Sequence, residues 1–526
     1  MTRNRLATGV LLGTGLLWTL LALHSLSAGG VTWDEVFDFE GVNGAFWHGI
    51  NWLKGARPDL HTITFDLEYF GNATRWPTYL LWRLLMTEPW ERFTTLSRTQ
   101  IVLSSGYIGL NHLNAIVFAL AGIGLTAALA WRLGGRRAAA FAGALLLLLP
   151  TWLGHGWMNS KDIPMAASYL LYTLGITLLM QQRRGGGPLR LLGIGLMAGS
   201  RVGSLVFIAL SEALLSPGLR RCPRARWLGS LAGGVLLGFL LTPQAWGDPL
   251  GYPLEAMRFI GERQGAGSPI ESLRYLAAHL VDLLPSPLLL GLLLLLLSLS
   301  RGGRIAAFLP TLLQLLIPPA LVVLGGKSLY NELRHLLMIQ PPLCVLGGLG
   351  YARALAALPD ARGNGNPRGL PKPLLRPLLV LSAAATVLLA TELLLLSPYQ
   401  YTYRSDLARL AEGGRGAALR RDYWGFSGRE TLARCLRQED CAARLLRLPL
   451  RVDPGSFNPD LIEASAALLR PAPPAGPEGS LLISTDPGTL AGRDTLAATR
   501  RLTLLPWPRQ ATLSAIAPDP EGRPAR

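Results

Sequence analysis

The chain has 526 residues, of which 50% are hydrophobic and only 16% are charged. Soluble domains carry roughly 25% charged residues, and the mean hydropathy here is +0.32, so the composition excludes a soluble multidomain protein, a disordered chain and a coiled coil. The net charge of +17 would suit nucleic-acid binding in a soluble protein, but basic cytoplasmic loops explain it without nucleic acid. We therefore expect a polytopic α-helical membrane protein.

Apolar runs recur along most of the chain, and a hydrocarbon core needs about 20 apolar residues per helix. The first run could be a cleaved secretory signal, because small residues follow it, but its length favours a retained helix. The fifth and sixth runs are short and could form one long segment. We predict about eleven membrane segments, over residues 6–27, 108–131, 137–153, 163–181, 189–200, 203–216, 228–243, 284–299, 305–325, 335–354 and 376–397.

Arginine and lysine mark every second loop between these segments. The positive-inside rule then predicts a cytoplasmic N-terminus, provided that residues 189–216 cross the membrane twice. We accordingly predict a membrane domain over 1–397 and an extracytoplasmic domain over 398–526. The outer loops are expected at residues 28–107, 154–162, 244–283 and 326–334.

The first outer loop opens with a pair of acids, Asp34 and Glu35, directly after the first helix. Further acids follow at Asp38 and Glu40. A solvated turn explains the first pair about as well as a catalytic base or a cation site does. The same loop is rich in aromatic residues, most of which we expect to anchor in the headgroup layer, and residues 76–85 predict a short interfacial helix.

Cations also stand in the later outer loops. Lys161 and Asp162 lie at the start of a predicted helix, where an acid favours the helix dipole. Arg201 is flanked by glycines between two apolar runs, so it is either a snorkelling side chain or a phosphate ligand.

One further outer loop gathers Lys327, Arg334 and His335 before an apolar helix. The positive-inside rule does not account for cations on the outer face, so an anionic ligand is the natural explanation. Acids and cations together suit a reaction on a lipid-linked phosphate, in which the cations hold the leaving group and a carboxylate deprotonates an acceptor hydroxyl. The sequence contains no P-loop, dinucleotide fingerprint or zinc-ligand spacing.

With the Asp-Glu pair after the first helix, these features resemble the GT-C glycosyltransferases, and more narrowly the bacterial glycosyltransferase-39 and protein O-mannosyltransferase branch. Some residues depart from the usual motifs: Ser160 stands where Pro is usual, Asn331 where Asp is usual, and Ser397 where His is usual. The short motifs that carry the resemblance are residues 159–164, 199–203, 329–336, 398–401 and 422–425.

The resemblance implies transfer of a sugar from a polyprenyl-phosphate donor to an envelope acceptor, which could be a protein, a lipid or a glycan. It implies a bacterial inner membrane, an outward-facing site and inversion at the sugar carbon. Asp34 would be the general base, with Glu35 beside it and Asp162 as a second acid. The donor phosphate would be held by the cations named above: Lys161, Arg201, Lys327, Arg334 and His335.

No cofactor is implied by the resemblance, although Asp34, Glu35 and Asp162 could hold a divalent cation. Two other classes stay open: a flippase or transporter of lipid-linked glycans, and a non-catalytic envelope subunit. A transporter would place ionisable residues near the bilayer midplane, often in repeated halves, whereas here they concentrate at helix ends.

The tail after residue 398 contains no predicted membrane segment. Residues 428–449 read as an amphipathic helix, and 480–485 and 511–516 read as strands. Cys435 and Cys441 could form a short disulfide in an oxidising compartment. We expect a small α/β unit that binds the acceptor or acts as a lid.

Overall fold

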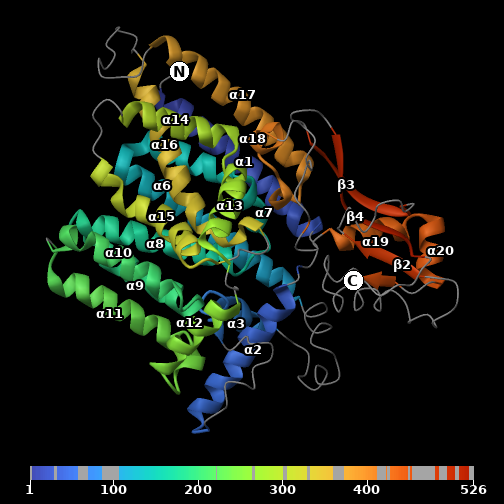
Figure 1. The fold of residues 1–526 in the computed structure, drawn as a ribbon, viewed down its shortest axis with the longest axis horizontal. Helices are drawn as coiled ribbons and strands as arrows, with labels where there is room; N and C mark the ends of the chain where they lie inside the picture. Colours follow the sequence, from blue (N-terminus) through green and yellow to red (C-terminus); the bar gives the residue numbers. More distant parts are fainter. Residues whose placement is uncertain are drawn as a thin grey trace.

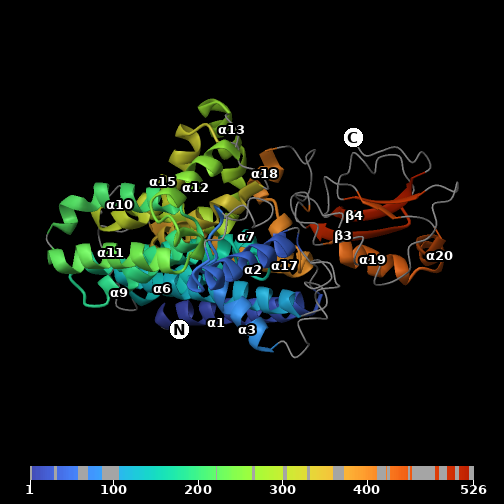
Figure 2. The ribbon, with the colours of Figure 1, turned by 90° about the horizontal axis from the view of Figure 1, so that it is seen from below.

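The fold was described from a computed structural model (Figures 1 and 2). The ranges that it describes are residues 3–28, 32, 34–56, 69–85, 106–220, 222–263, 267–299, 305–327, 332–358, 372–411, 422, 427–447, 450–452, 480–484, 495–503 and 509–519. Most of these residues are helical and form one body, beside which a small strand-bearing unit lies (Figure 1).

Helices occupy all eleven predicted segments. In the helical body they are α1 (Arg3–Ala28), α2 (Asp34–Leu53), α3 (Trp76–Leu85), α6 (Tyr107–Leu147), α7 (Pro150–His155), α8 (Asp162–Met180), α9 (Gly186–Ser200), α10 (Ser204–Leu219), α11 (Arg224–Leu240), α12 (Gly251–Arg263), α13 (Pro269–Leu280), α14 (Ser286–Leu299), α15 (Leu309–Leu324), α16 (Gln340–Ala357) and α17 (Lys372–Leu396). Short 3-10 helices join them: η3 (Pro243–Ala245), η4 (Val281–Leu283), η5 (Ile305–Phe308) and η6 (Glu332–Ile339).

Helix α6 contains the predicted segment 108–131 and most of the segment 137–153, whose end lies in α7, and it folds back on itself at Gly135. This glycine has φ 80° and ψ −173°, a backbone conformation that residues with a Cβ rarely adopt. The two halves run antiparallel, because a Cβ on Gly143 would meet Ala127, and one on Gly122 would meet Trp152. The fold-back therefore lies at the opposite end of α6 from its start at Tyr107.

Four helices in the described residues are long and apolar enough to cross a membrane: α1, α6, α8 and α17. The apolar helices α10 and α15 are shorter, and α13 with η4 meets α14 at a bend of 100°. The prediction of a polytopic helical membrane protein is confirmed. Helix α1 packs against this body along one face, with the ring of Trp18 5.4 Å from that of Trp157.

Helices α8 and α9 form a tight antiparallel pair. A Cβ on Gly175 would meet the backbone of Arg190, and one on Gly193 would meet the backbone of Tyr172. This register sets the beginning of α8 opposite the end of α9, so the loops before α8 and after α9 emerge on the same side of the body.

Part of the predicted first outer loop is helical. The stretch after Asp34 is a helix of 20 residues, α2, rather than a loop. Residues 76–85 form a helix, α3, as predicted, yet its inner face is buried: the ring of Phe39 lies 5.1 Å from that of Trp82 and 5.0 Å from that of Tyr107. These three aromatic residues therefore join α2, α3 and α6 instead of anchoring in headgroups.

The tail begins by packing on the helical body. After η7 (Gln400–Thr402) and α18 (Asp406–Ala411), Arg409 forms a bidentate ion pair with Glu392 of α17, at 2.6 and 2.9 Å. The backbone of Tyr401 packs closely against Gly154 of helix α7. A Cβ on Gly154 would lie only 2.2 Å from the Tyr401 amide nitrogen.

The rest of the tail is a small α/β unit, as predicted. In the described residues its four strands are β1 (Leu450–Val452), β2 (Ser480–Ser484), β3 (Ala497–Thr503) and β4 (Arg509–Asp519). They pair in the order β1-β2-β4-β3, with β1 and β2 parallel and the other pairs antiparallel. The single helix expected at 428–449 is in fact two helices, and a disulfide joins Cys435 to Cys441 across the break. The helices of the unit are α19 (Gly428–Leu436) and α20 (Glu439–Arg447).

Candidate active site

Two carboxylates lie on one face of α2. Asp34 is the first residue of the helix and Asp38 follows one turn later, and side chains four apart on a helix are neighbours. The side chain of Asp34 is 20% exposed, whereas that of Asp38 is only 3% exposed. The helix therefore presents one carboxylate to solvent and buries the other beneath it.

Lys161 connects the two carboxylates. Its Nζ lies 2.6 Å from Asp38 Oδ1 and 3.6 Å from Asp34 Oδ2. The turn before α8 holds it there, because Asn159 Oδ1 accepts hydrogen bonds from the amides of Lys161 and Asp162 at 3.1 and 2.8 Å. The motif residue Asn159 thus orients the lysine that follows it.

Asp162 forms a second centre of charge beside the first. Its Oδ2 accepts a hydrogen bond from Asn159 Nδ2 at 3.0 Å, and its Oδ1 pairs with Arg201. The pairing follows from the antiparallel register of α8 and α9, since Asp162 begins one helix and Arg201 ends the other. Arg201 keeps 28% of its side chain exposed.

Arg334 joins the two centres. Its Nη1 donates to Asp34 Oδ2 at 2.7 Å, and its Nε lies 4.0 Å from Asp162 Oδ2. It sits in η6, three hundred residues after Asp34 in the chain. The imidazole of the next residue, His335, interacts electrostatically with Arg334 and Asp162.

Two further residues that the sequence did not assign to the site, Arg75 and Ser160, hold Asp38 in place. Arg75 Nη1 lies 3.1 Å from Asp38 Oδ1, and the hydroxyl of Ser160 donates to Asp38 Oδ2 at 2.6 Å. The sequence feature that could have placed Asp38 in the site is its spacing of four residues from Asp34, because such residues are neighbours on one face of a helix. Ser160, which stands where the motif usually has proline, supplies a hydroxyl that proline lacks.

The loop that carries Arg75 is docked on the turn before Arg201. The amide of Ala73 donates to the carbonyl of Gly199 at 3.0 Å, and a Cβ on Gly71 would lie 2.1 Å from the same oxygen. Only glycine at position 71 allows this approach. The loop and the Arg201 turn are thereby fixed relative to one another.

Glu35, predicted as a neighbour of the catalytic base, lies elsewhere. Its side chain is buried, with Oε1 2.9 Å from His112 Nε2 of α6, and Oε2 accepts a hydrogen bond from the Thr32 amide at 2.7 Å. These contacts tie the start of α2 to α6. In the described contacts Glu35 does not meet Asp34, Lys161 or Asp162.

Lys327 is also placed apart from this cluster. Its Nζ donates to the carbonyl of Gly261 at the end of α12, and its carbonyl accepts from Ser272 of α13 at 2.9 Å. In the described contacts it therefore links α12 and α13 and does not reach Asp34 or Asp162. The motif residues Tyr330 and Asn331 lie outside the described residues.

The electrostatic balance of the site keeps Asp34 ionised. Burial raises the pKa of this carboxyl, but the charges of Lys161 and Arg334 lower it more strongly. The pKa is therefore held well below its usual range. At neutral pH the site presents a carboxylate that already has two cationic partners.

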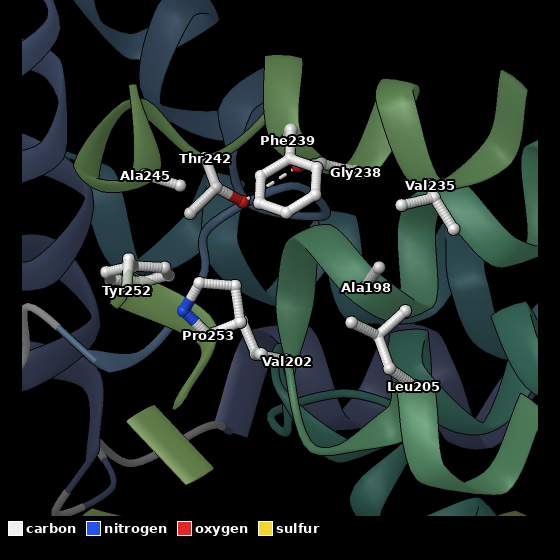
Figure 3. A pocket seen from close by; sticks show the side chains of 10 residues that line it. All are labelled: Ala198, Val202, Leu205, Val235, Gly238, Phe239, Thr242, Ala245, Tyr252 and Pro253. Atoms are coloured by element: carbon white, nitrogen blue, oxygen red, sulfur yellow. Dashed lines mark hydrogen bonds between the residues drawn. The ribbon is translucent and has the colours of Figure 1, made fainter. Parts of the chain in front are cut away.

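An apolar pocket begins at Val202, directly after Arg201 (Figure 3). It lies between the ends of α9 and α11 and the start of α12, and the Thr242 hydroxyl beside it donates to the carbonyl of Gly238 at 2.9 Å. Its lining is mostly hydrophobic, and consists of Ala198, Val202, Leu205, Val235, Gly238, Phe239, Thr242, Ala245, Tyr252 and Pro253.

The described residues contain no group of three or more His, Cys, Asp or Glu side chains that could hold a metal ion. In particular Glu35, one of the three acids considered for a divalent cation, pairs with His112 instead. The carboxylates of the site are held by lysine and arginine.

No protein-family model matches the chain, and no curated protein matches it. Similar solved structures include ArnT from Cupriavidus metallidurans, bound to undecaprenyl phosphate and in the apo state, each 16% identical with a TM-score of 0.47, covering 97% of this chain and 98% of that chain. Another is the archaeal oligosaccharyltransferase AglB from Archaeoglobus fulgidus, in complex with an inhibitory peptide and a dolichol-phosphate, 13% identical with a TM-score of 0.37, covering 74% and 56% of the two chains. Similarity at this level assigns no activity to the chain.

Proposed function

We propose that the protein is a membrane glycosyltransferase of the GT-C type, which transfers a sugar from a polyprenyl-phosphate donor to an acceptor of the cell envelope. One observation carries the proposal. The exposed edge of the charge cluster consists of one carboxylate, Asp34, and two cations, Lys161 and Arg201. The cations can hold a phosphate, and the carboxylate can accept the proton of an acceptor hydroxyl.

In the proposed reaction the acceptor oxygen attacks the anomeric carbon of the sugar. The bond from that carbon to the phosphate oxygen breaks, and the polyprenyl phosphate leaves with the electron pair. Arg201, Lys161 and Arg334 stabilise the charge that grows on the leaving phosphate. The proton of the acceptor passes to Asp34, and attack from the face opposite the phosphate inverts the anomeric carbon.

Asp162 acts in this proposal as a positioning residue. It holds Arg201 by an ion pair and lies 4.0 Å from Arg334, so it sets the distance between two cations that receive the phosphate. Truncating it would leave both guanidinium groups without an anchor on α8.

We also propose that the site faces the extracytoplasmic side of a bacterial inner membrane, with the N-terminus in the cytoplasm. The basic loops recur at the opposite helix ends. The disulfide between Cys435 and Cys441 supports this orientation, because such bonds persist in oxidising compartments.

The test is transfer of labelled sugar from a panel of synthetic polyprenyl-phosphate sugars into native envelope extract. Purified wild type is compared with Asp34→Asn and with Glu35→Gln, a neighbouring acid outside the cluster. We expect transfer by wild type and Glu35→Gln and a loss of about 100-fold or more for Asp34→Asn, in line with removal of a general base.

Equal transfer by wild type and folded Asp34→Asn would remove Asp34 from the mechanism. Donor binding without transfer, for every donor of the panel, would contradict an enzyme and favour a flippase or a non-catalytic subunit. The panel also identifies the sugar class.

A further inference from the structure

A second pocket lies at the fold-back of α6, away from the candidate active site. It has a volume of about 310 Å³, within the usual range for ligand pockets. Three arginines line it, Arg136 and Arg137 from the fold-back and Arg353 from α16. Leu349, Ala352 and Ala356 of α16 provide an apolar wall.

The fold-back sequence accounts for this arrangement. Gly134 lies so close to α16 that a Cβ there would meet Leu349 at 2.3 Å, and Gly135 supplies the positive φ that reverses the chain. The two arginines that follow are therefore carried to the edge of α16. Arg136 is exposed and Arg137 is partly buried.

Arg353 is held in position by its neighbours. Its Nη1 donates to the hydroxyl of Ser298 at 3.1 Å, and its guanidinium lies 5.5 Å from the centre of the Phe308 ring. A guanidinium fixed in this way loses little conformational freedom when it binds an anion. The described residues that line the pocket include three arginines and no carboxylate, so the lining suits an anion.

The pocket lies about one bilayer thickness from the active-site cluster. Asn111 of α6 contacts Glu35 at the end of the body where Asp34 lies. Gly134 stands 23 residues further along the same half of α6, and a helix rises about 1.5 Å per residue, which gives about 35 Å. The two sites therefore lie at opposite ends of a helix that is long enough to cross a membrane.

The two residues Trp131 and Arg132, which shortly precede the fold-back in the chain, are typical of a membrane–water interface. Trp131 is 52% exposed, and the guanidinium of Arg132 lies 5.6 Å from the centre of its ring. Tryptophan and arginine favour the headgroup layer. A ligand at this depth can place a phosphate against the arginines and an acyl chain along the apolar wall.

We propose that this pocket binds the phosphate group of an anionic phospholipid in the leaflet opposite the active site. Basic pockets between membrane helices bind such headgroups, and paired guanidinium groups match phosphate oxygens in geometry. The proposal does not depend on the proposed function.

The test is native mass spectrometry of the purified full chain in detergent with added cardiolipin or phosphatidylglycerol, and with phosphatidylcholine as the zwitterionic control. The variant Arg136→Gln/Arg353→Gln is compared with Arg183→Gln/Arg184→Gln, which removes two exposed arginines from another loop. Thermal unfolding verifies that each variant folds, and the exposed Arg136→Gln serves alone if the double variant does not.

We expect wild type and the Arg183→Gln/Arg184→Gln variant to retain one or more anionic lipids, and the pocket variant to retain them about tenfold or more weakly. Equal retention by both double variants would overturn the proposal. Equal binding of phosphatidylcholine would also overturn it. Displacement of the lipid by millimolar inorganic phosphate would instead assign the pocket to a soluble phosphate compound.

Discussion

Asp38 is the residue whose replacement tests the construction of the charge cluster most directly. In the variant Asp38→Asn, Arg75 and Lys161 lose the carboxylate that lies 3.1 and 2.6 Å from them. Because Arg75 and Asp38 are both almost fully buried, an uncompensated guanidinium remains in the interior. Breaking a buried ion pair in this way costs about 3–5 kcal/mol, a large part of the 5–15 kcal/mol that stabilises a typical domain.

The same change is expected to alter catalysis in the molecules that still fold. Without Asp38, the carboxylate partner left to Lys161 is Asp34, whose Oδ2 lies 3.6 Å from the lysine Nζ in the wild-type structure. We expect these two groups to move closer together in the variant. The donor phosphate must then compete for Lys161, and Asp34 becomes a weaker base. We expect kcat/KM for the donor to fall by about 10- to 100-fold per folded molecule, equivalent to about 1.4–2.8 kcal/mol.

A matched control is Glu392→Gln, which breaks the buried pair of Glu392 with Arg409 near the tail. It is expected to lower stability by a similar amount and to leave transfer per folded molecule unchanged. The assays are thermal unfolding in detergent and transfer normalised to folded protein. The reasoning would be refuted if Asp38→Asn unfolded at the same temperature as the wild type. It would also be refuted if Glu392→Gln lost as much transfer per folded molecule as Asp38→Asn.

Three other changes have distinct expected results. Glu35→Gln removes the pairing with His112 and should lower the free energy of unfolding by about 1–3 kcal/mol without changing transfer per folded molecule; a selective loss of transfer would place Glu35 in the mechanism. The depressed pKa of Asp34 means that its ion pairs stabilise the fold above pH about 4, the unfolded value, and lose this effect as the pH falls further. The difference in melting temperature between wild type and Asp34→Asn should therefore stay constant from pH 7 to about pH 4 and shrink as the pH falls below about 4. A difference that does not shrink there would contradict this. Gly154→Ala would place a Cβ 2.2 Å from the Tyr401 amide and should lower stability by about 1–3 kcal/mol, which differential scanning fluorimetry would detect.

The membrane architecture could be predicted because its signals are local. A run of about 20 apolar residues specifies a spanning helix wherever it occurs, and Gly134 and Gly135 mark the break in α6. The contact between Asp162 and Arg201 could also have been predicted. Asp162 begins one helix and Arg201 follows the next, and two antiparallel helices joined by a short connection bring these two ends together. The fold of the tail was predicted only in part, since β1 has three residues and β3 carries adjacent arginines that hide its pattern.

The site was harder to predict for two physical reasons. Asp34 and Glu35 are adjacent in the sequence, and in an extended loop they could act together; in a helix they point about 100° apart, so only one faces Lys161. The partner of Lys161 is instead Asp38, one turn along. The contact between Asp34 and Arg334 spans 300 residues, and no periodicity or spacing in the sequence specifies it.

The pairing within the cluster bears on how the proposed reaction is controlled. Three carboxylates face four cations, and in this arrangement Asp34 is paired with Lys161 and Arg334. A carboxylate with two cationic partners is a poor base. A donor phosphate that binds Lys161 and Arg334 weakens those pairs, and the basicity of Asp34 then rises. On this proposal Asp34 can take the acceptor proton only when the donor is present, so a phosphate analogue of the donor should raise the affinity for the acceptor, and a lack of such coupling would contradict this order.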